Sequence, residues 1–288
     1  MIHIVPEAKW LPADGLKLEP SALTVVKNET NCYVLAGPGA GKTELLAQRA
    51  CYLLQTNKCT HPKRILAISF KRDAAKNILE RVKKRCGDEL ARRFSSLTYD
   101  AFAKRLFDQF RNTLPMEYHP SPQYDILTDY GEIIHAFELF ESSIYNDYQR
   151  QDIIRAFENT AIPFNKYPSN ELEKAAINIQ NKFLKGKDGL PSKLTFKAIT
   201  RLSRYIILTN KIIRKALRIT YGYVFLDEFQ DTTTLQYEFI KSCFHDCDSV
   251  LTAVGDDKQR IMVWAGADRE IFKKFKEDFN AQKYILTI

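Results

Sequence analysis

The chain has 288 residues, of which 45% are hydrophobic and 27% are charged, and its net charge is +8. This composition is typical of a soluble globular protein with one large domain or two moderate ones. No apolar run approaches the roughly 18–20 residues that a membrane-spanning helix needs, and the first twenty residues lack the apolar core of a signal peptide. We therefore expect a cytoplasmic protein with no membrane partner. The six cysteines form no CxxC pair, and a cytoplasmic location favours free thiols.

The positive charge is concentrated in two blocks. Residues 63–93 hold eleven Lys and Arg against four acids, and residues 182–218 hold eleven against Asp188 alone. Between them, residues 117–174 hold eleven acids against four bases. This distribution favours a directional positive surface for a polyanion, although each block alone could be a solvated helix face.

The first predicted strand, Asn31–Leu35, leads into a glycine-rich loop. Glycines in such a loop let backbone N–H groups surround a polyphosphate, while a lysine reaches the β- and γ-phosphates and a hydroxyl binds Mg²⁺. A helix over Lys42–Leu54 follows the loop. The candidate nucleotide-binding residues are Ala36, Gly37, Pro38, Gly39, Ala40, Gly41, Lys42, Thr43 and, in the first turn of the helix, Glu44.

Two more strand–helix pairs follow along the chain. The pattern predicts a strand over Arg64–Ser69 and a helix over Asp73–Lys84, and then a short strand that ends at Thr98 before a helix over Asp100–Phe110. Aromatic and cationic residues stand where these strands end, which fits bases stacked on rings and phosphates on cations. The candidates for single-strand binding here are Phe70, Lys71, Thr98 and Tyr99; Phe70 and the nearby Phe102 could equally be core residues.

The alternation of strands and helices stops at a proline-rich segment, 113–122, and resumes at Tyr221. Strands that alternate with helices predict a parallel sheet covered on both faces. We therefore predict an α/β domain made of 1–112 and 206–288, interrupted by an all-α insertion over 113–205.

Two acidic segments follow the last apolar runs. Asp227 and Glu228 come directly after Tyr223–Leu226, at the expected carboxyl end of a buried strand, where Asp227 can hold Mg²⁺ and Glu228 can polarise the attacking water. Beyond the strand Val250–Val254, the amide of Gln259 can lie near the γ-phosphate and report the nucleotide state. Trp264 is a flat platform for a nucleobase, or a core residue.

The series resembles the UvrD/Rep/PcrA family of superfamily 1 DNA helicases. The segments that are similar to its motifs are AGPGAGKT (36–43), ILAISFKRDAAKNILERV (65–82), SSLTYDAF (95–102), VFLDEFQDTTTLQ (224–236) and VGDDKQRIMVWAGA (254–267). The resemblance implies a RecA-like P-loop NTPase domain with a helical insertion, which binds Mg-ATP through Lys42 and Thr43. It also implies that Asp227 binds the metal, that Glu228 activates water and that Gln259 senses the γ-phosphate. In addition, it implies that Phe70, Tyr99 and Trp264 lie along a single DNA strand, on which the motor moves 3′ to 5′.

The sequence departs from this family at informative places. The family has a glutamine ahead of the phosphate loop that reads adenine, whereas Leu18–Asn28 contains none and Glu19 or Ser21 occupies that neighbourhood. The run Lys283–Ile288 resembles the strand that leads into a second motor domain. The resemblance therefore implies a fragment of a longer helicase, whose second motor domain supplies the remaining arginines of the ATP site.

Three interpretations remain open from the sequence. The favoured one is the ATP-binding half of a DNA helicase or translocase, with a nuclease or repair protein as a further partner; repair and phage-defence helicases look alike at this level. The second is a non-catalytic module, ordered by a nucleotide, that binds nucleic acid or a partner protein. The third is another phosphate-loop enzyme such as a small-molecule kinase.

Overall fold

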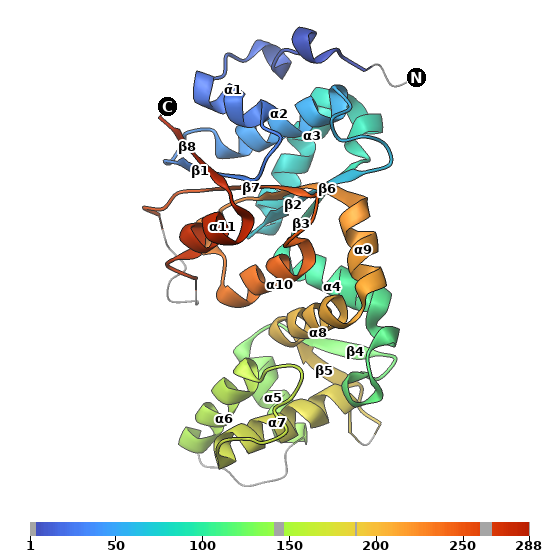
Figure 1. Ribbon diagram of the computed structural model, residues 1–288. Helices are drawn as coiled ribbons and strands as arrows, with labels where there is room; N and C mark the ends of the chain where they lie inside the picture. Colours follow the sequence, from blue (N-terminus) through green and yellow to red (C-terminus); the bar gives the residue numbers. More distant parts are fainter. Residues whose placement is uncertain (1–3, 141–146, 188, 260–266, 288) are drawn as a thin grey trace. The chain divides into compact units, whose positions relative to one another are not determined.

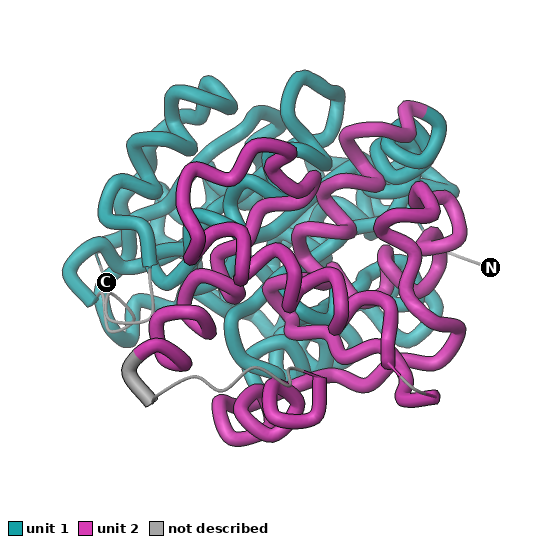
Figure 2. The backbone as a smooth tube through the Cα atoms, turned by 90° about the horizontal axis from the view of Figure 1, so that it is seen from below, with its two compact units in different colours: residues 1–102, 212–288 teal, residues 103–211 magenta. Residues whose placement is uncertain are grey.

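The computed structural model describes residues 4–140, 147–187, 189–259 and 267–287, and the chain divides into two compact units. Unit 1 comprises residues 1–102 and 212–288, and unit 2 comprises residues 103–211 (Figure 2). The domain boundaries predicted from the sequence lie at 112/113 and 205/206. In the structure the boundaries between the units lie at 102/103, within helix α4 (Tyr99–Phe110), and at 211/212, at the start of helix α9 (Lys211–Thr220).

Unit 1 contains a parallel sheet with the strand order β3-β2-β6-β7-β1-β8. The middle of a parallel sheet is buried on both faces, which is why β1, β2, β6 and β7 are mostly apolar, whereas the edge strands β3 and β8 are more polar. Because the strands are parallel, their carboxyl ends meet at one edge, where open α/β sheets bind their ligands. The strands are β1 (Cys32–Ala36), β2 (Arg64–Ser69), β3 (Phe94–Thr98), β6 (Tyr221–Leu226), β7 (Val250–Gly255) and β8 (Gln282–Leu286).

Helices cover both faces of this sheet. Figure 1 shows α1 (Pro20–Lys27), α2 (Lys42–Gln55) and α3 (Arg72–Ala91) on one side, and α10 (Thr234–Phe244) and α11 (Ile271–Phe279) on the other. The first layer shares a core with the sheet, and on the second side the rings of Phe272 and Phe275 lie 5.3 and 5.2 Å from that of Phe229. The predicted α/β class, a parallel sheet flanked by helices, is confirmed. Helix α9 (Lys211–Thr220) leads into β6.

A buried arginine fixes the helix that follows the phosphate loop. Arg49 of α2 is fully buried, and its Nε donates to Thr252 Oγ1 of β7 at 3.0 Å. Its Nη1 donates to the carbonyl oxygens of Val25 and Val26 in the last turn of α1. Carbonyls in the last turn of a helix lack i+4 partners, and here Val25 O accepts from the cap residue Asn28 besides the arginine. The guanidinium therefore helps to satisfy this end of α1 and joins α1, α2 and the sheet.

Unit 2 is mainly helical. The rings of Phe140 and Phe157 each lie 5.1 Å from that of Phe183, at the centre of a core that α5, α6 and α7 share. The predicted all-α insertion also contains two short parallel strands, which is a correction: each has only four residues, too few to show a strand period. The elements of unit 2 after α4 are β4 (Tyr124–Leu127), α5 (Tyr130–Phe140), α6 (Asp147–Asn159), α7 (Glu171–Lys185), β5 (Ser192–Thr195) and α8 (Phe196–Thr209).

In the part of the chain that the structure describes, no helix combines the length and apolar character that crossing a bilayer requires.

Candidate active site

The glycine-rich loop lies between the end of β1 and the start of α2. Gly39 and Gly41 have φ angles of 75° and 73°, in the left-handed region that residues with a Cβ rarely adopt. A Cβ added at Gly37 or Gly39 would meet no atom within 4 Å. The loop therefore borders open space at the positive end of a 14-residue helix that has no side-chain cap, which is the arrangement that binds phosphate groups.

The acidic pair lies at the end of β6, directly opposite the loop's lysine. Lys42 Nζ is 3.8 Å from Glu228 Oε2, and the two side chains are 12% and 38% exposed. Asp227 is buried, and its backbone N–H donates to Ile68 O of β2 at 2.8 Å. The fold thus brings together the lysine and the acids that the sequence singled out.

Glu228 has a strained backbone. Its φ and ψ angles are 47° and 45°, the left-handed region, and its N–H donates to Asp227 Oδ1 at 3.1 Å. A non-glycine residue held in this conformation costs roughly 1–3 kcal/mol, and such residues concentrate at functional sites. The strain turns the chain sharply between the acids and the short 3₁₀ segment Phe229–Asp231.

The surroundings of Asp227 disfavour the charged form of its carboxyl group. Burial raises the pKa of its carboxyl group to about 6, and the negative charge of Glu228 adds to this, while the Glu228 N–H, Lys42 and Ser69 act in the opposite direction. A buried carboxylate that is only partly compensated by Lys42 suits a nearby cation.

The residues present fit Mg²⁺. This ion takes oxygen ligands, commonly one or two from the protein and the rest from phosphates and water. The Asp227 carboxylate and the Thr43 hydroxyl supply that chemistry. No group of three or more His, Cys, Asp or Glu side chains that could hold a metal occurs among the described residues.

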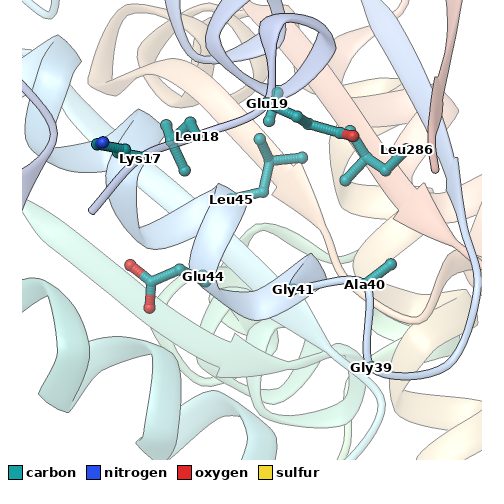
Figure 3. Close-up of a pocket in the computed structure, with 10 residues that line it drawn as sticks. Lys17, Leu18, Glu19, Gly39, Ala40, Gly41, Glu44, Leu45 and Leu286 are labelled. Atoms are coloured by element: carbon teal, nitrogen blue, oxygen red, sulfur yellow. The ribbon is translucent and has the colours of Figure 1, made fainter. Parts of the chain in front are cut away.

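A cavity of about 240 Å³ adjoins the phosphate loop (Figure 3). Glu19 contributes its carboxylate, which accepts hydrogen bonds from Ser21 Oγ at 2.8 Å and from Thr287 Oγ1 at 3.1 Å. The walls combine apolar side chains with the backbone of the loop. The lining residues are Lys17, Leu18, Glu19, Ala22, Gly39, Ala40, Gly41, Glu44, Leu45 and Leu286.

Glu44 lines the same cavity and is fixed by two arginines of α3. Its Oε2 accepts hydrogen bonds at 2.7 Å from Arg81 Nη1 and from Arg85 Nη2. The carboxylate therefore ties the start of α2 to α3. Arg81 and Arg85 were not predicted as part of the site, although their i,i+4 spacing places them on one face of the helix.

The candidate DNA-binding residues have different environments. Phe70 is half-buried and Lys71 exposed at the end of β2, and Thr98, half-buried, ends the neighbouring β3. Tyr99 is only 3% exposed, and its hydroxyl lies 2.9 Å from Thr232 Oγ1. Its ring is enclosed, so it offers no free face to a base in this conformation. Trp264 lies outside the described residues.

Two further candidates have clear places. Gln259 is exposed on the turn after β7, and its N–H donates to Asp256 O at 3.3 Å. Phe102 is 2% exposed, with its ring 5.5 Å from that of Phe239, so the core alternative holds for this residue. Gln230, which was not predicted from the sequence although it lies within the acidic motif, is 3% exposed and hydrogen-bonded to Glu228.

A glycine-rich loop between a strand and a helix, facing acids at the end of a strand of the same parallel sheet, defines a nucleotide-binding domain of the P-loop class. The sequence model of the UvrD/REP helicase N-terminal domain matches residues 18–280, and the chain belongs to this family. The RecA-like fold and the resemblance predicted from the sequence are thereby confirmed.

The chain is also similar to three proteins that are described as DNA helicases. It is 31% identical over 273 residues to a probable DNA helicase II homolog of Mycoplasma genitalium, covering 87% of this chain and 37% of that protein. It is 28% identical over 280 residues to the ATP-dependent DNA helicase Rep of Escherichia coli, covering 94% and 40%. A probable DNA helicase of Mycoplasma pneumoniae is 26% identical over 296 residues, covering 95% and 52%. The chain thus spans between about a third and a half of the length of these relatives.

Proposed function

We propose that the full-length protein is an ATP-dependent DNA helicase or translocase and that the 288 residues of the chain form the ATP-binding half of its motor. The observation that carries this proposal is the approach of Lys42 to Glu228, 3.8 Å apart, beside the buried Asp227. Family membership supplies the substrate class, because nucleotide-binding geometry alone is shared by many P-loop enzymes.

The loop residues 36–43 and the start of α2 hold the phosphates of ATP. Lys42 neutralises the β- and γ-phosphates, and Thr43 and Asp227 hold Mg²⁺, which neutralises developing charge on the phosphate oxygens when bound. Glu228 orients and polarises the attacking water, and Gln259 reports the γ-phosphate to the segment beyond it. The oxygen ligands, the open cradle and the raised pKa of Asp227 support these roles.

The nucleobase lies in the cavity beside the loop. Apolar walls from Leu18, Leu45 and Leu286 suit the faces of a planar ring, and the Glu19 carboxylate suits an exocyclic amino group. Glu44 closes the cavity near the phosphates, held by the two arginines of α3.

Single-stranded DNA passes over the carboxyl ends of β2 and β3. Phe70 stacks on a base and Lys71 contacts a phosphate, with Thr98 beside them; Tyr99 supports this edge from within through Thr232. Trp264 is a further stacking platform in the proposal. The direction of movement, 3′ to 5′, comes from the family resemblance.

A second motor domain completes the ATP site. Hydrolysis needs positive charge on the transferring phosphoryl group, and a supplied arginine is typically worth about 10³–10⁵ in rate. The greater length of the relatives supports such a domain in the full-length protein. A nuclease or repair protein is a further proposed partner.

The alternative is a non-catalytic module ordered by the nucleotide. Steady-state ATP hydrolysis by the full-length protein, with and without a single-stranded oligonucleotide, separates the two. The helicase proposal expects stimulation by the oligonucleotide and its loss in Glu228→Gln. ATP binding with no turnover under either condition would favour the module.

A further inference from the structure

One buried amide connects the two acidic motifs of unit 1. Gln230 is 3% exposed in the short segment Phe229–Asp231. Its Nε2 donates to Glu228 Oε2 at 2.8 Å, and its Oε1 accepts from the backbone N–H of Asp256 at 3.0 Å. The two bonds use opposite ends of the amide, so each fixes the orientation that the other requires.

Each end of this connection meets a group with a proposed role. Glu228 Oε2, which accepts from Gln230, is also the oxygen that faces Lys42. At the other end, Asp256 begins the turn of Gln259: Asp256 O accepts from Gln259 N–H, and Asp256 Oδ1 accepts from Lys258 N–H at 2.9 Å. A movement of either end changes the position that the amide can adopt.

The amide of Gln230 lies close against the backbone of β7 at Gly255. A Cβ added at Gly255 would lie 2.3 Å from Gln230 Oε1, far inside van der Waals contact. The absence of a side chain at Gly255 therefore permits the close approach of the amide to β7. A buried polar group at such a position is costly to leave unpaired, which favours retention of both hydrogen bonds.

We propose that Gln230 is a positioning residue that transmits the position of the Glu228 carboxylate to the turn 256–259, and so couples DNA binding to ATP hydrolysis. This inference rests on the proposed function, because it assigns how one half of that site acts on the other. It predicts that loss of the amide uncouples the two activities and leaves nucleotide binding intact, since Lys42 and the phosphate loop are unchanged.

The test uses three variants of the full-length protein: Gln230→Ala, Gly255→Ala and the double variant. Nucleotide affinity is measured with a fluorescent ATP analogue, and turnover with and without a single-stranded oligonucleotide. Gln230→Ala should lower the DNA stimulation factor by about fivefold or more, the lower range of typical couplings between sites, with nucleotide affinity unchanged. Gly255→Ala should also lower the DNA stimulation factor, because the added methyl group displaces the amide of Gln230.

The double variant separates this role from general damage. If both substitutions act through the same amide, the double variant loses no more stimulation than Gln230→Ala alone, since the methyl group then has no amide to displace. Additive losses would overturn the proposal, because Gly255→Ala would then act through another neighbour, such as Phe272 at 3.0 Å.

A matched control removes another buried hydrogen bond from the same unit. Tyr237 is 1% exposed, and its hydroxyl donates to Asp278 Oδ2 at 2.6 Å. Tyr237→Phe should lower stability and leave the stimulation factor unchanged. A normal factor in folded Gln230→Ala would refute the relay, whereas absence of stimulation in the unmodified protein would refute the proposed function instead.

Discussion

At the scale of single residues, the site depends on charges that the fold holds close together. Lys42 and Glu228 come from distant parts of the sequence and meet at 3.8 Å, and Asp227 is buried beside them. Each of these side chains has a different proposed task, so each substitution should produce a different defect. Two predictions follow from their charges.

The first concerns the phosphate-binding lysine. Lys42→Ala should abolish Mg-ATP binding, because the positive charge at the β- and γ-phosphates is removed. Glu228→Gln keeps the shape of the side chain and should bind ATP normally but stop hydrolysis. Equilibrium titration with a labelled ATP analogue checks both variants; wild-type affinity in Lys42→Ala would show that the nucleotide binds elsewhere.

The second concerns pH and the buried aspartate. The pKa of Asp227 is raised to about 6 in the folded protein, so the folded state favours the neutral carboxyl group. The stability that this group contributes is therefore fully present below about pH 4 and is lost as the pH rises through 6. With a chelator at pH 7.5, Asp227→Asn should therefore increase the free energy of unfolding by about 1–3 kcal/mol. Thermal unfolding at pH 7.5 and pH 4 measures this gain, which should be confined to the higher pH.

Asp268 provides a control of opposite sign. Burial raises the pKa of this carboxyl group, but the hydrogen bonds from Lys274, from the Glu270 N–H and from Thr234, with the charge of Lys274, together outweigh burial and lower it. Asp268→Asn should therefore decrease stability at pH 7.5. A stability gain in both variants would mean that loss of a negative charge, and not burial of Asp227, explains the effect.

At the scale of elements, neighbouring strands of the parallel sheet set where each side chain can act. Ser69 of β2 is paired with Thr98 of β3, so the residues that follow both strands lie at one edge. Phe70 is half-buried there, whereas Tyr99 is enclosed. The two aromatic residues should therefore contribute differently to DNA binding.

The third prediction compares these rings. Phe70→Ala should weaken binding of single-stranded DNA by about 1–3 kcal/mol, the value of one base–aromatic stack. Tyr99→Phe should leave DNA affinity unchanged and lower stability by about 1 kcal/mol, because only the hydrogen bond with Thr232 is lost. Fluorescence anisotropy and thermal unfolding measure both; equal DNA affinity in Phe70→Ala and the unmodified protein would place Phe70 in the core.

The elements of unit 1 were predictable because their patterns are strong. The apolar runs of β2 and β7 and the glycine-rich loop between β1 and α2 each allow one interpretation. The strands β4 and β5 were missed because four residues cannot establish a period. The burial of Tyr99 and the two bonds of Gln230 depend on contacts between distant segments, which no local pattern contains.

At the scale of the whole molecule, the net charge of +8 bears on DNA binding. The fourth prediction is that log K for single-stranded DNA falls linearly with log salt concentration, with a slope of about −0.7 for each phosphate that is neutralised. Lys71→Ala should make the slope shallower by about 0.7 if Lys71 contacts one phosphate. Titrations at several salt concentrations test this, with the surface variant Lys76→Ala of α3 as control; identical slopes in all three proteins would exclude the proposed contact.

The strand order of unit 1 has a consequence for how the chain is made. In the sheet, β6 and β7 lie between β2 and β1, yet both follow unit 2 in the sequence. While the ribosome is still synthesising unit 2, β2 can pair only with β3, and β1 has neither of its neighbours. Unpaired strand edges are sites of aggregation during synthesis. We therefore expect the nascent chain to require chaperone protection over this interval, and the nucleotide site to form only after residue 255 has left the ribosome.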